Sequence, residues 1–141
     1  MKKSAIAAFL LVMLSGCMSD SQAGTLFEYE GTLIGNNSDV LAIVNGIENG
    51  SSVEEIELHT KEKPYGLTIH YADVPDGKVE RWTRENAGRL FTLIDNVEDV
   101  DMVIASETYA YSRKEMEKEL GKSFDEVTTV DQWKEVQEWI N

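Results

Sequence analysis

The spacing of hydrophobic and polar residues along the chain predicts helices separated by short strands. After a group of Asn, Ser and Asp cap residues, apolar side chains recur at helical spacing until two Asn-Gly pairs interrupt them, which predicts a helix over about 39–47. A second apolar stripe predicts a helix near 80–95. Capping-box patterns at Ser112 and Thr129 predict two further helices, and the first of these should end at Gly121.

Two segments of alternating polarity, 53–58 and 67–71, flank a polar turn and predict a β-hairpin. Pairing by face matches Leu58 with Ile69 and Ile56 with Tyr71 on the inner face, and Glu57 with His70 and His59 with Thr68 on the outer face. The apolar inner face of this hairpin needs a covering layer.

A short apolar run over 100–105 predicts a central strand, which could continue through Tyr109 and Tyr111. The predicted order of elements is therefore α-β-β-α-β-α-α. A hairpin followed by one helical crossover forms a small mixed sheet, whose apolar face needs helices to cover it. We therefore predict an α+β fold, a small two-layer sandwich in which helices pack on a short mixed sheet of about three strands, within a single domain over 25–141.

The first 16 residues have the order of an export signal, with Lys2 and Lys3 before an apolar run and small residues after it. A membrane-spanning helix needs about 20 apolar residues, and this run is too short, so we expect 1–16 to be a signal peptide that is removed. Leu14-Ser15-Gly16-Cys17 resembles the lipobox of bacterial lipoproteins, which implies a diacylglyceryl thioether on Cys17 and cleavage before it. An ordinary secretory leader with a stray cysteine is the alternative.

Residues 17–24 would then be the lipidated cysteine and a small, polar tether. Cys17 is the only cysteine, so its modification leaves no thiol for a disulfide. Because two acyl chains give stable anchoring where one gives only marginal binding, we predict a lipid-anchored protein on the extracytoplasmic face of the cell membrane.

Charge restricts the class of partner. The composition, 42% hydrophobic and 28% charged, is typical of a folded domain. The chain holds 26 acidic and 13 basic side chains, which gives a formal net charge of −13. Nucleic acid is excluded as a partner because binding phosphates needs a basic surface. An acidic domain also does not bind anionic lipid unaided, so contact with the membrane is expected through the lipid on Cys17.

Four segments of the chain resemble a known family. They are Ile34-Gly35-Asn36-Asn37-Ser38-Asp39-Val40, Pro64-Tyr65-Gly66-Leu67-Thr68, Leu93-Ile94-Asp95-Asn96-Val97 and Tyr111-Ser112-Arg113. They are similar to the bacterial Domain of Unknown Function 4825 over about residues 26–120, and more loosely over the last helix, with Leu33 standing where an aromatic residue is expected. The resemblance implies an extracytoplasmic module of Gram-positive lipoproteins, found also appended to membrane metallopeptidases of the beta-lactam-sensor type. It implies no activity, because the family has no assigned catalytic residues.

Candidate metal ligands occur on the predicted hairpin. Glu57, His59 and His70 would share its outer face, and a carboxylate with two imidazoles is a plausible zinc ligand set. Zinc sites usually need a further protein ligand and a concavity, however, and this face is the solvent side of a sheet. A second cluster, of carboxylates, consists of Asp95, Glu98, Asp99 and Asp101. Clustered carboxylates could hold calcium, but this segment lacks the pattern of a calcium-binding loop. We therefore expect no metal and no other cofactor, with Glu57, His59 and His70 as the alternative ligand set.

The chain carries no recognisable nucleophile with a base beside it. Gly121-Lys122-Ser123 superficially resembles a phosphate loop, but Met116 stands where the motif needs glycine, and a helix precedes the motif in place of a strand. Both histidines lie on the hairpin and no glycine-flanked serine elbow occurs, so we expect no catalytic activity. Acidic pairs such as Asp73 with Asp76 leave a carboxylate enzyme as an alternative.

Tyr111, beside an arginine, and Trp139, near the end of the chain, are the candidate partner-binding residues, because aromatic side chains are enriched in binding patches. Packing within the domain is the alternative interpretation of both. We predict a lipid-anchored, non-catalytic extracytoplasmic domain that acts as a protein-interaction or sensory module at the cell envelope, with a membrane or exported protein as its partner. The alternatives are a small-ligand or metal-binding sensor domain and an envelope hydrolase.

Overall fold

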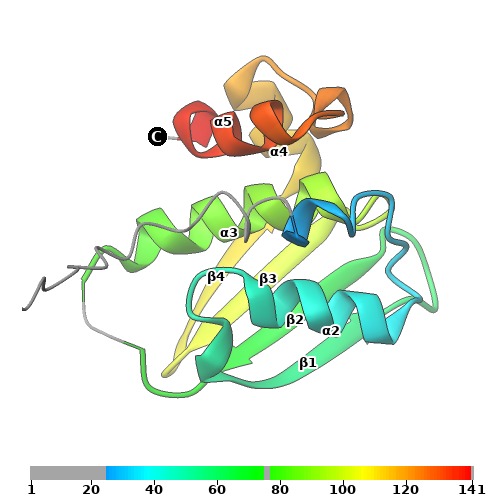
Figure 1. The fold of residues 1–141 in the computed structure, drawn as a ribbon. Coiled ribbons are helices and arrows are strands. Elements are labelled where there is room, and N and C mark those ends of the chain that lie inside the picture. The colour runs from blue at the N-terminus through cyan, green and yellow to red at the C-terminus, as the bar shows by residue number, and fades with distance from the viewer. Residues whose placement is uncertain (1–24, 75–76, 141) are drawn as a thin grey trace, which may run out of the picture.

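The computed structural model describes residues 25–74 and 77–140, which form a mixed sheet with helices packed on it (Figure 1). In chain order the elements are α2 (Asn37–Gly46), the short 3-10 helix η1 (Gly50–Ser52), β1 (Val53–His59), β2 (Gly66–Tyr71), α3 (Val79–Leu93), β3 (Asp99–Ile104), β4 (Glu107–Ser112), α4 (Arg113–Leu120), the 3-10 helix η2 (Phe124–Glu126) and α5 (Val130–Ile140). The fold is α+β, as the sequence pattern predicts.

The sheet has four strands in the order β1-β2-β3-β4, where the sequence predicted about three. β1 with β2 and β3 with β4 form antiparallel hairpins, and the central pair β2 and β3 is parallel, connected through α3. The difference arises after Ile104, where the segment expected to continue as one strand reverses direction. Ala105 in this turn has a φ of 54°, a left-handed conformation that matches the twist of a tight hairpin.

The first hairpin has the predicted faces but not the predicted register. The strands pair two residues away from the expected alignment, with Leu58 opposite Leu67 and Ile56 opposite Ile69. Because His59 pairs with Gly66, the turn occupies 60–65 and is shorter than the segment 59–66 between the two predicted strands. A shift of two residues keeps every side chain on its own face, because strand side chains alternate with a period of two. A bulge between Val53 and Glu55 then brings Val53 opposite Tyr71.

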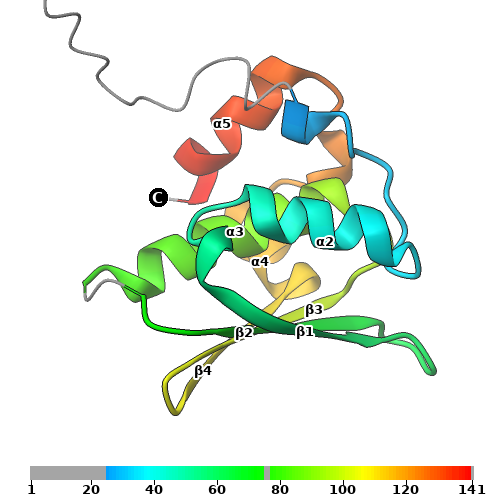
Figure 2. The same ribbon diagram turned by 60° about the horizontal axis from the view of Figure 1, so that its bottom comes forward.

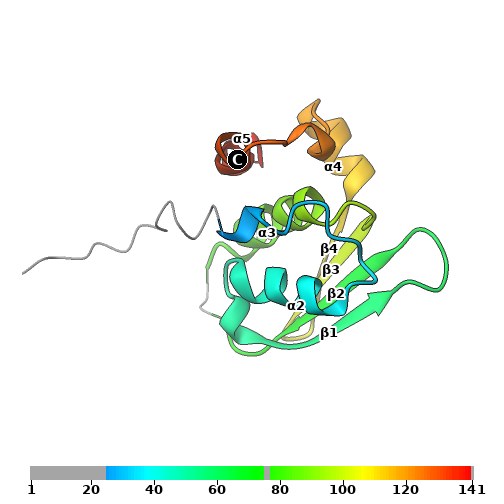
Figure 3. The ribbon, with the colours of Figure 1, turned by 45° about the vertical axis from the view of Figure 1, so that its right-hand side comes forward.

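Helices cover one face of the sheet only (Figure 2). The strand residues beneath them are buried, and they include Leu67, Ile69, Tyr71, Val100, Met102 and Ile104. α5 packs on the side of α3 that faces away from the sheet, and so adds a partial third layer to the predicted two (Figures 1 and 3). Gly88 of α3 allows this close approach, because a Cβ atom there would overlap the side chain of Ile140.

The helix ends follow the predicted capping patterns in part. The side chain of Asn36 accepts a backbone N–H from the first turn of α2 at 3.3 Å. At α5 the predicted capping box forms completely, with Gln132 N donating to Thr129 Oγ1 and Thr129 N donating to Gln132 Oε1. The box predicted at Ser112 is wrong, since the Ser112 side chain makes no capping hydrogen bond where β4 runs directly into α4. α4 ends at Gly121, which has a φ of 65°, as predicted.

A buried arginine closes the C-terminal end of α3. Arg113 is 6% exposed, and its guanidinium donates to the carbonyl oxygens of Phe91 at 2.6 Å, Ile94 at 2.8 Å and Val97 at 2.9 Å. In the loop after α3, Asn96 Oδ1 accepts the backbone N–H of Ile34 at 2.7 Å. Three of the four segments that resemble the family therefore meet at this end of the fold and hold it together.

Candidate functional site

The face of the sheet that points away from the helices is not covered by any described element (Figure 2). The strand register assigns to it the residues that alternate with the core, namely Glu55, Glu57, His59, Thr68, His70, Asp99, Asp101, Val103, Thr108, Ala110 and Ser112. We call these residues the open sheet face. It carries four carboxylates and two imidazoles and no Lys or Arg.

Two hydrogen bonds across β1 and β2 order one half of the open sheet face. His70 Nε2 donates to Glu57 Oε2 at 2.8 Å, and His59 Nε2 shares a hydrogen bond with Thr68 Oγ1 at 2.9 Å. These are the pairs that the sequence matched, although in the observed register they meet diagonally. The hydrogen bond from His70 holds the pKa of Glu57 below its ordinary value of 4.5, so this carboxylate is ionised at neutral pH.

β3 extends the negative charge to the middle of the sheet. Asp101 lies beside Thr68, and Thr68 lies beside Glu57, so the three side chains form a row across β1, β2 and β3. Among the described residues, Asp99 and Asp101 form no side-chain hydrogen bond or ion pair. Carboxylates that lie close together without a cation repel one another and favour contact with a positively charged group. The open sheet face is therefore suited to a basic surface.

The predicted zinc ligands share a face without forming a metal site. Within residues 25–74 and 77–140, no group of three or more His, Cys, Asp and Glu side chains is placed to hold a metal ion. His59 and His70 instead each use Nε2 in a hydrogen bond within the sheet. The carboxylates considered for calcium do not form such a group either. The Gly121-Lys122-Ser123 segment is the end of α4 and the turn that leads to η2.

The two candidate partner-binding aromatics lie on different elements and are half-buried. Tyr111 projects from β4 to the helix side of the sheet, where its hydroxyl shares a hydrogen bond with Thr83 Oγ1 at 2.7 Å. Burial raises the pKa of Tyr111. Trp139 lies on α5, with Lys122 Nζ at 4.2 Å from the ring centroid. Because both rings contact their own chain, each offers only part of its surface to a partner.

The predicted signal peptide and Cys17 lie outside the described residues. Among the helices of the described part of the chain, none combines the length and the apolar character needed to cross a membrane. The described chain begins at Thr25 on the helix side of the molecule (Figure 2).

The sequence pattern predicts only half of the open sheet face. It places Glu57, His59 and His70 together on the hairpin, but Asp99 and Asp101 fall in an acidic cluster after the predicted helix near 80–95. The missed signal is the alternation of polar and apolar residues over 99–102, which is typical of a strand with one polar face.

A family model described as a domain of unknown function (DUF4825) matches residues 26–116. The matched segment holds both hairpins, α2 and α3, and ends within α4, so that α5 lies outside it. No curated protein and no solved structure matches the chain. Because the match covers more than half of its length, the chain belongs to the family of the domain of unknown function DUF4825.

Proposed function

We propose that this protein is a lipid-anchored, non-catalytic binding module on the extracytoplasmic face of the cell membrane, and that it binds a membrane or exported protein through the open sheet face. The observation that carries the proposal is the charge of that face, on which four carboxylates stand without a Lys or Arg. The partner surface is basic, because complementary charge steers association and disfavours wrong partners.

The β4 side of the open sheet face supplies contact area of a different kind. Val103 lies opposite Thr108, and Ala110 lies opposite Asp101, so small uncharged side chains adjoin the carboxylates. Protein interfaces commonly combine a centre poor in charge with a polar rim. A partner would therefore pack its own uncharged side chains over β4 and place its Lys or Arg side chains over β1, β2 and β3.

Anchoring follows from the lipobox-like segment that ends at Cys17. The support is the sequence Leu14-Ser15-Gly16-Cys17 and the charge of the domain, which does not favour contact with anionic lipid without an anchor. In cells fed a clickable palmitate analogue, the wild-type protein should carry the label in the membrane fraction. Cys17→Ser should lose both the label and the membrane fraction, whereas a labelled Cys17→Ser protein would contradict lipidation at this residue.

Cross-linking in intact cells, followed by purification of the lipidated protein and mass spectrometry, tests the docking proposal. We expect one reproducible membrane or exported partner, and its loss or marked depletion in the unanchored Cys17→Ser control. With that partner purified, the double variant Glu57→Lys and Asp101→Lys should bind at least about tenfold more weakly. The matched control is the double variant Glu115→Lys and Glu126→Lys, which makes the same change in net charge at exposed positions of α4 and η2.

Equal loss of affinity in the two double variants would contradict the open sheet face as the docking surface, because it would show only an effect of net charge. Unchanged affinity of the Glu57→Lys and Asp101→Lys variant would contradict it as well. Turnover of an envelope substrate by the soluble domain would contradict the non-catalytic part of the proposal.

A further inference from the structure

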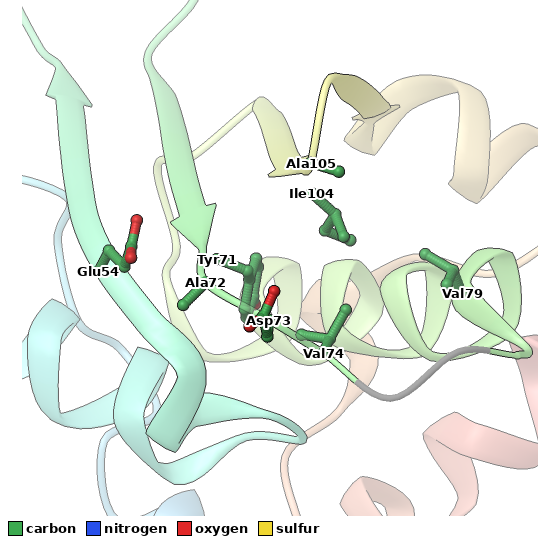
Figure 4. Close-up of a pocket in the computed structure, with 8 residues that line it drawn as sticks. All are labelled: Glu54, Tyr71, Ala72, Asp73, Val74, Val79, Ile104 and Ala105. Carbon is green, nitrogen blue, oxygen red and sulfur yellow. The ribbon is translucent and has the colours of Figure 1, made fainter.

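A cavity of about 410 Å³ opens at one end of the sheet, on the side of the helices (Figure 4). Its walls come from β1, from the residues that follow β2, from the first turn of α3 and from the turn between β3 and β4. Pockets that bind small molecules typically have volumes of about 300–1,000 Å³. This cavity is separate from the open sheet face.

The topology of the sheet favours a binding site at this position. β2 and β3 are the parallel pair, and the cavity lies at their carboxyl ends, where Tyr71 and Ile104 line it. α3 connects the two strands and its first residue, Val79, forms another wall. In open sheets with parallel strands, ligands bind beyond the carboxyl ends of those strands.

The bulge in β1 turns one acidic side chain into the cavity. Glu54 is the additional residue between Val53 and Glu55, and it lines the cavity, whereas Glu55 pairs with His70 on the open sheet face. Bulges commonly redirect a side chain in this way near binding sites. Two adjacent carboxylates of β1 therefore belong to different surfaces of the molecule.

The chemistry of the walls selects a class of ligand. In Figure 4 the side chains of Val74, Val79 and Ile104 point toward a common space, which gives an apolar wall. Glu54 and Asp73 contribute carboxylates, and no Lys, Arg or His is among the described residues that line the cavity. The backbone N–H groups in the first turn of α3 carry a partial positive charge that attracts anions, but the two carboxylates repel them.

We propose that this cavity binds a small organic cation, an ammonium group attached to an apolar chain. The ammonium group lies between the carboxylates of Glu54 and Asp73, and the apolar chain packs against Val74, Val79 and Ile104. This activity is independent of docking at the open sheet face, and each can fail without the other.

Three probes that share one apolar chain test the proposal, namely hexylamine, 1-hexanol and hexanoate. Each is titrated into the chain from residue 17 carrying Cys17→Ser, which retains every described residue, at about 150 mM salt to screen long-range attraction. Amide NMR spectra report the position and the saturation of binding. Hexylamine should produce saturable shifts at Val79, Ile104 and Ala105, 1-hexanol should bind at least about fivefold more weakly, and hexanoate should leave these amides unshifted.

Variants at the cavity distinguish binding of hexylamine at this site from the general attraction of a cation to an acidic protein. Asp73→Asn and Glu54→Gln should each weaken hexylamine binding about tenfold. The matched control is Glu55→Gln, which removes the neighbouring carboxylate of the same strand and should bind hexylamine as the wild type does. The proposal is overturned by any one of three results: no saturable shift at these amides, equal shifts with hexylamine and hexanoate, or equal effects of Glu54→Gln and Glu55→Gln.

Discussion

Replacing Arg113 with methionine removes the group that closes the C-terminal end of α3. The guanidinium makes three hydrogen bonds to the carbonyl oxygens of Phe91, Ile94 and Val97, and its central carbon lies 5.3 Å from the ring centroid of Phe91. Methionine fills a similar volume but donates no hydrogen bond. The carbonyls at the end of α3 would then be buried without a donor.

The magnitude follows from these contacts. A hydrogen bond from a charged donor contributes about 1.5–3 kcal/mol to stability. Three bonds from one guanidinium do not add fully, because the loop after α3 can relax once the side chain is gone. We therefore expect Arg113→Met to lower the free energy of unfolding by about 3–5 kcal/mol, a large part of the total for a domain of this size, which is about 5–15 kcal/mol.

Urea-induced unfolding, followed by tryptophan fluorescence, measures this loss. The matched control is Lys114→Met, which makes the same substitution at the next, exposed residue of α4 and should change stability by less than about 0.5 kcal/mol. Arg113→Lys keeps the charge, but one ammonium group cannot reach all three carbonyls, so it should lose more than half as much stability as Arg113→Met.

A loss below about 1 kcal/mol for Arg113→Met would refute the reasoning, because it would show that the carbonyls find other partners at little cost. Equal loss in Arg113→Met and Lys114→Met would refute it too. If Arg113→Met does not fold, Arg113→Lys provides the measurement against the same control.

Three further predictions concern the capping box and two titrating groups. Thr129→Ala should destabilise the protein by about 1 kcal/mol in thermal unfolding, because it removes the hydroxyl oxygen that accepts the backbone N–H of Gln132, and an unchanged midpoint would contradict the capping role. Glu57 should titrate by NMR below its ordinary pKa of 4.5, and His70→Ala should raise the pKa of Glu57 because it removes the hydrogen bond that lowers it most. The pKa of Glu57 is lower in the folded protein than in the unfolded chain. The stability that the Glu57–His70 hydrogen bond contributes is therefore present above pH 4.5 and is lost as the pH falls through the folded-state pKa of Glu57. Burial raises the pKa of Tyr71 from 10.0 to about 12, so between these pH values the unfolded chain loses the Tyr71 proton while the folded protein keeps it. The free energy of unfolding should therefore be unaffected by Tyr71 below pH 10 and should fall as the pH rises toward 12. Tyr71→Phe should remove this alkaline loss of stability.

The helices could be predicted from the sequence because their ends carry local signals. The Thr129 and Gln132 capping box and the glycine at position 121 act within one turn, and both are found where predicted. The surroundings of α3 could not be predicted, because its apolar stripe marks only one side of the helix. Glu85 is 1% exposed, and its carboxylate receives a hydrogen bond from Arg81 at 2.8 Å, in a helix that α2, the sheet and α5 cover from several directions.

The sequence predicts on which face of its strand each candidate residue lies, but not which of these residues the folded sheet brings together. Alternation within each strand placed Glu57 and His70 on the outer face whatever the register, since a two-residue slip preserves faces. The reversal at Ala105 was missed because its turn lacks the glycine or asparagine that normally marks a left-handed position. The bulge that separates Glu54 from Glu55 depends on pairing between two strands, and the pattern of a single strand does not contain it.

Photo-cross-linking from single positions tests the central claim most directly. A photoreactive residue at Ala110 places the reactive group on the open sheet face, and one at Lys118 places it on the exposed side of α4. In intact cells carrying the otherwise wild-type protein, we predict that Ala110 yields a specific adduct with one membrane or exported protein and that Lys118 does not. An adduct to the same protein from Lys118 and none from Ala110 would contradict docking through the open sheet face.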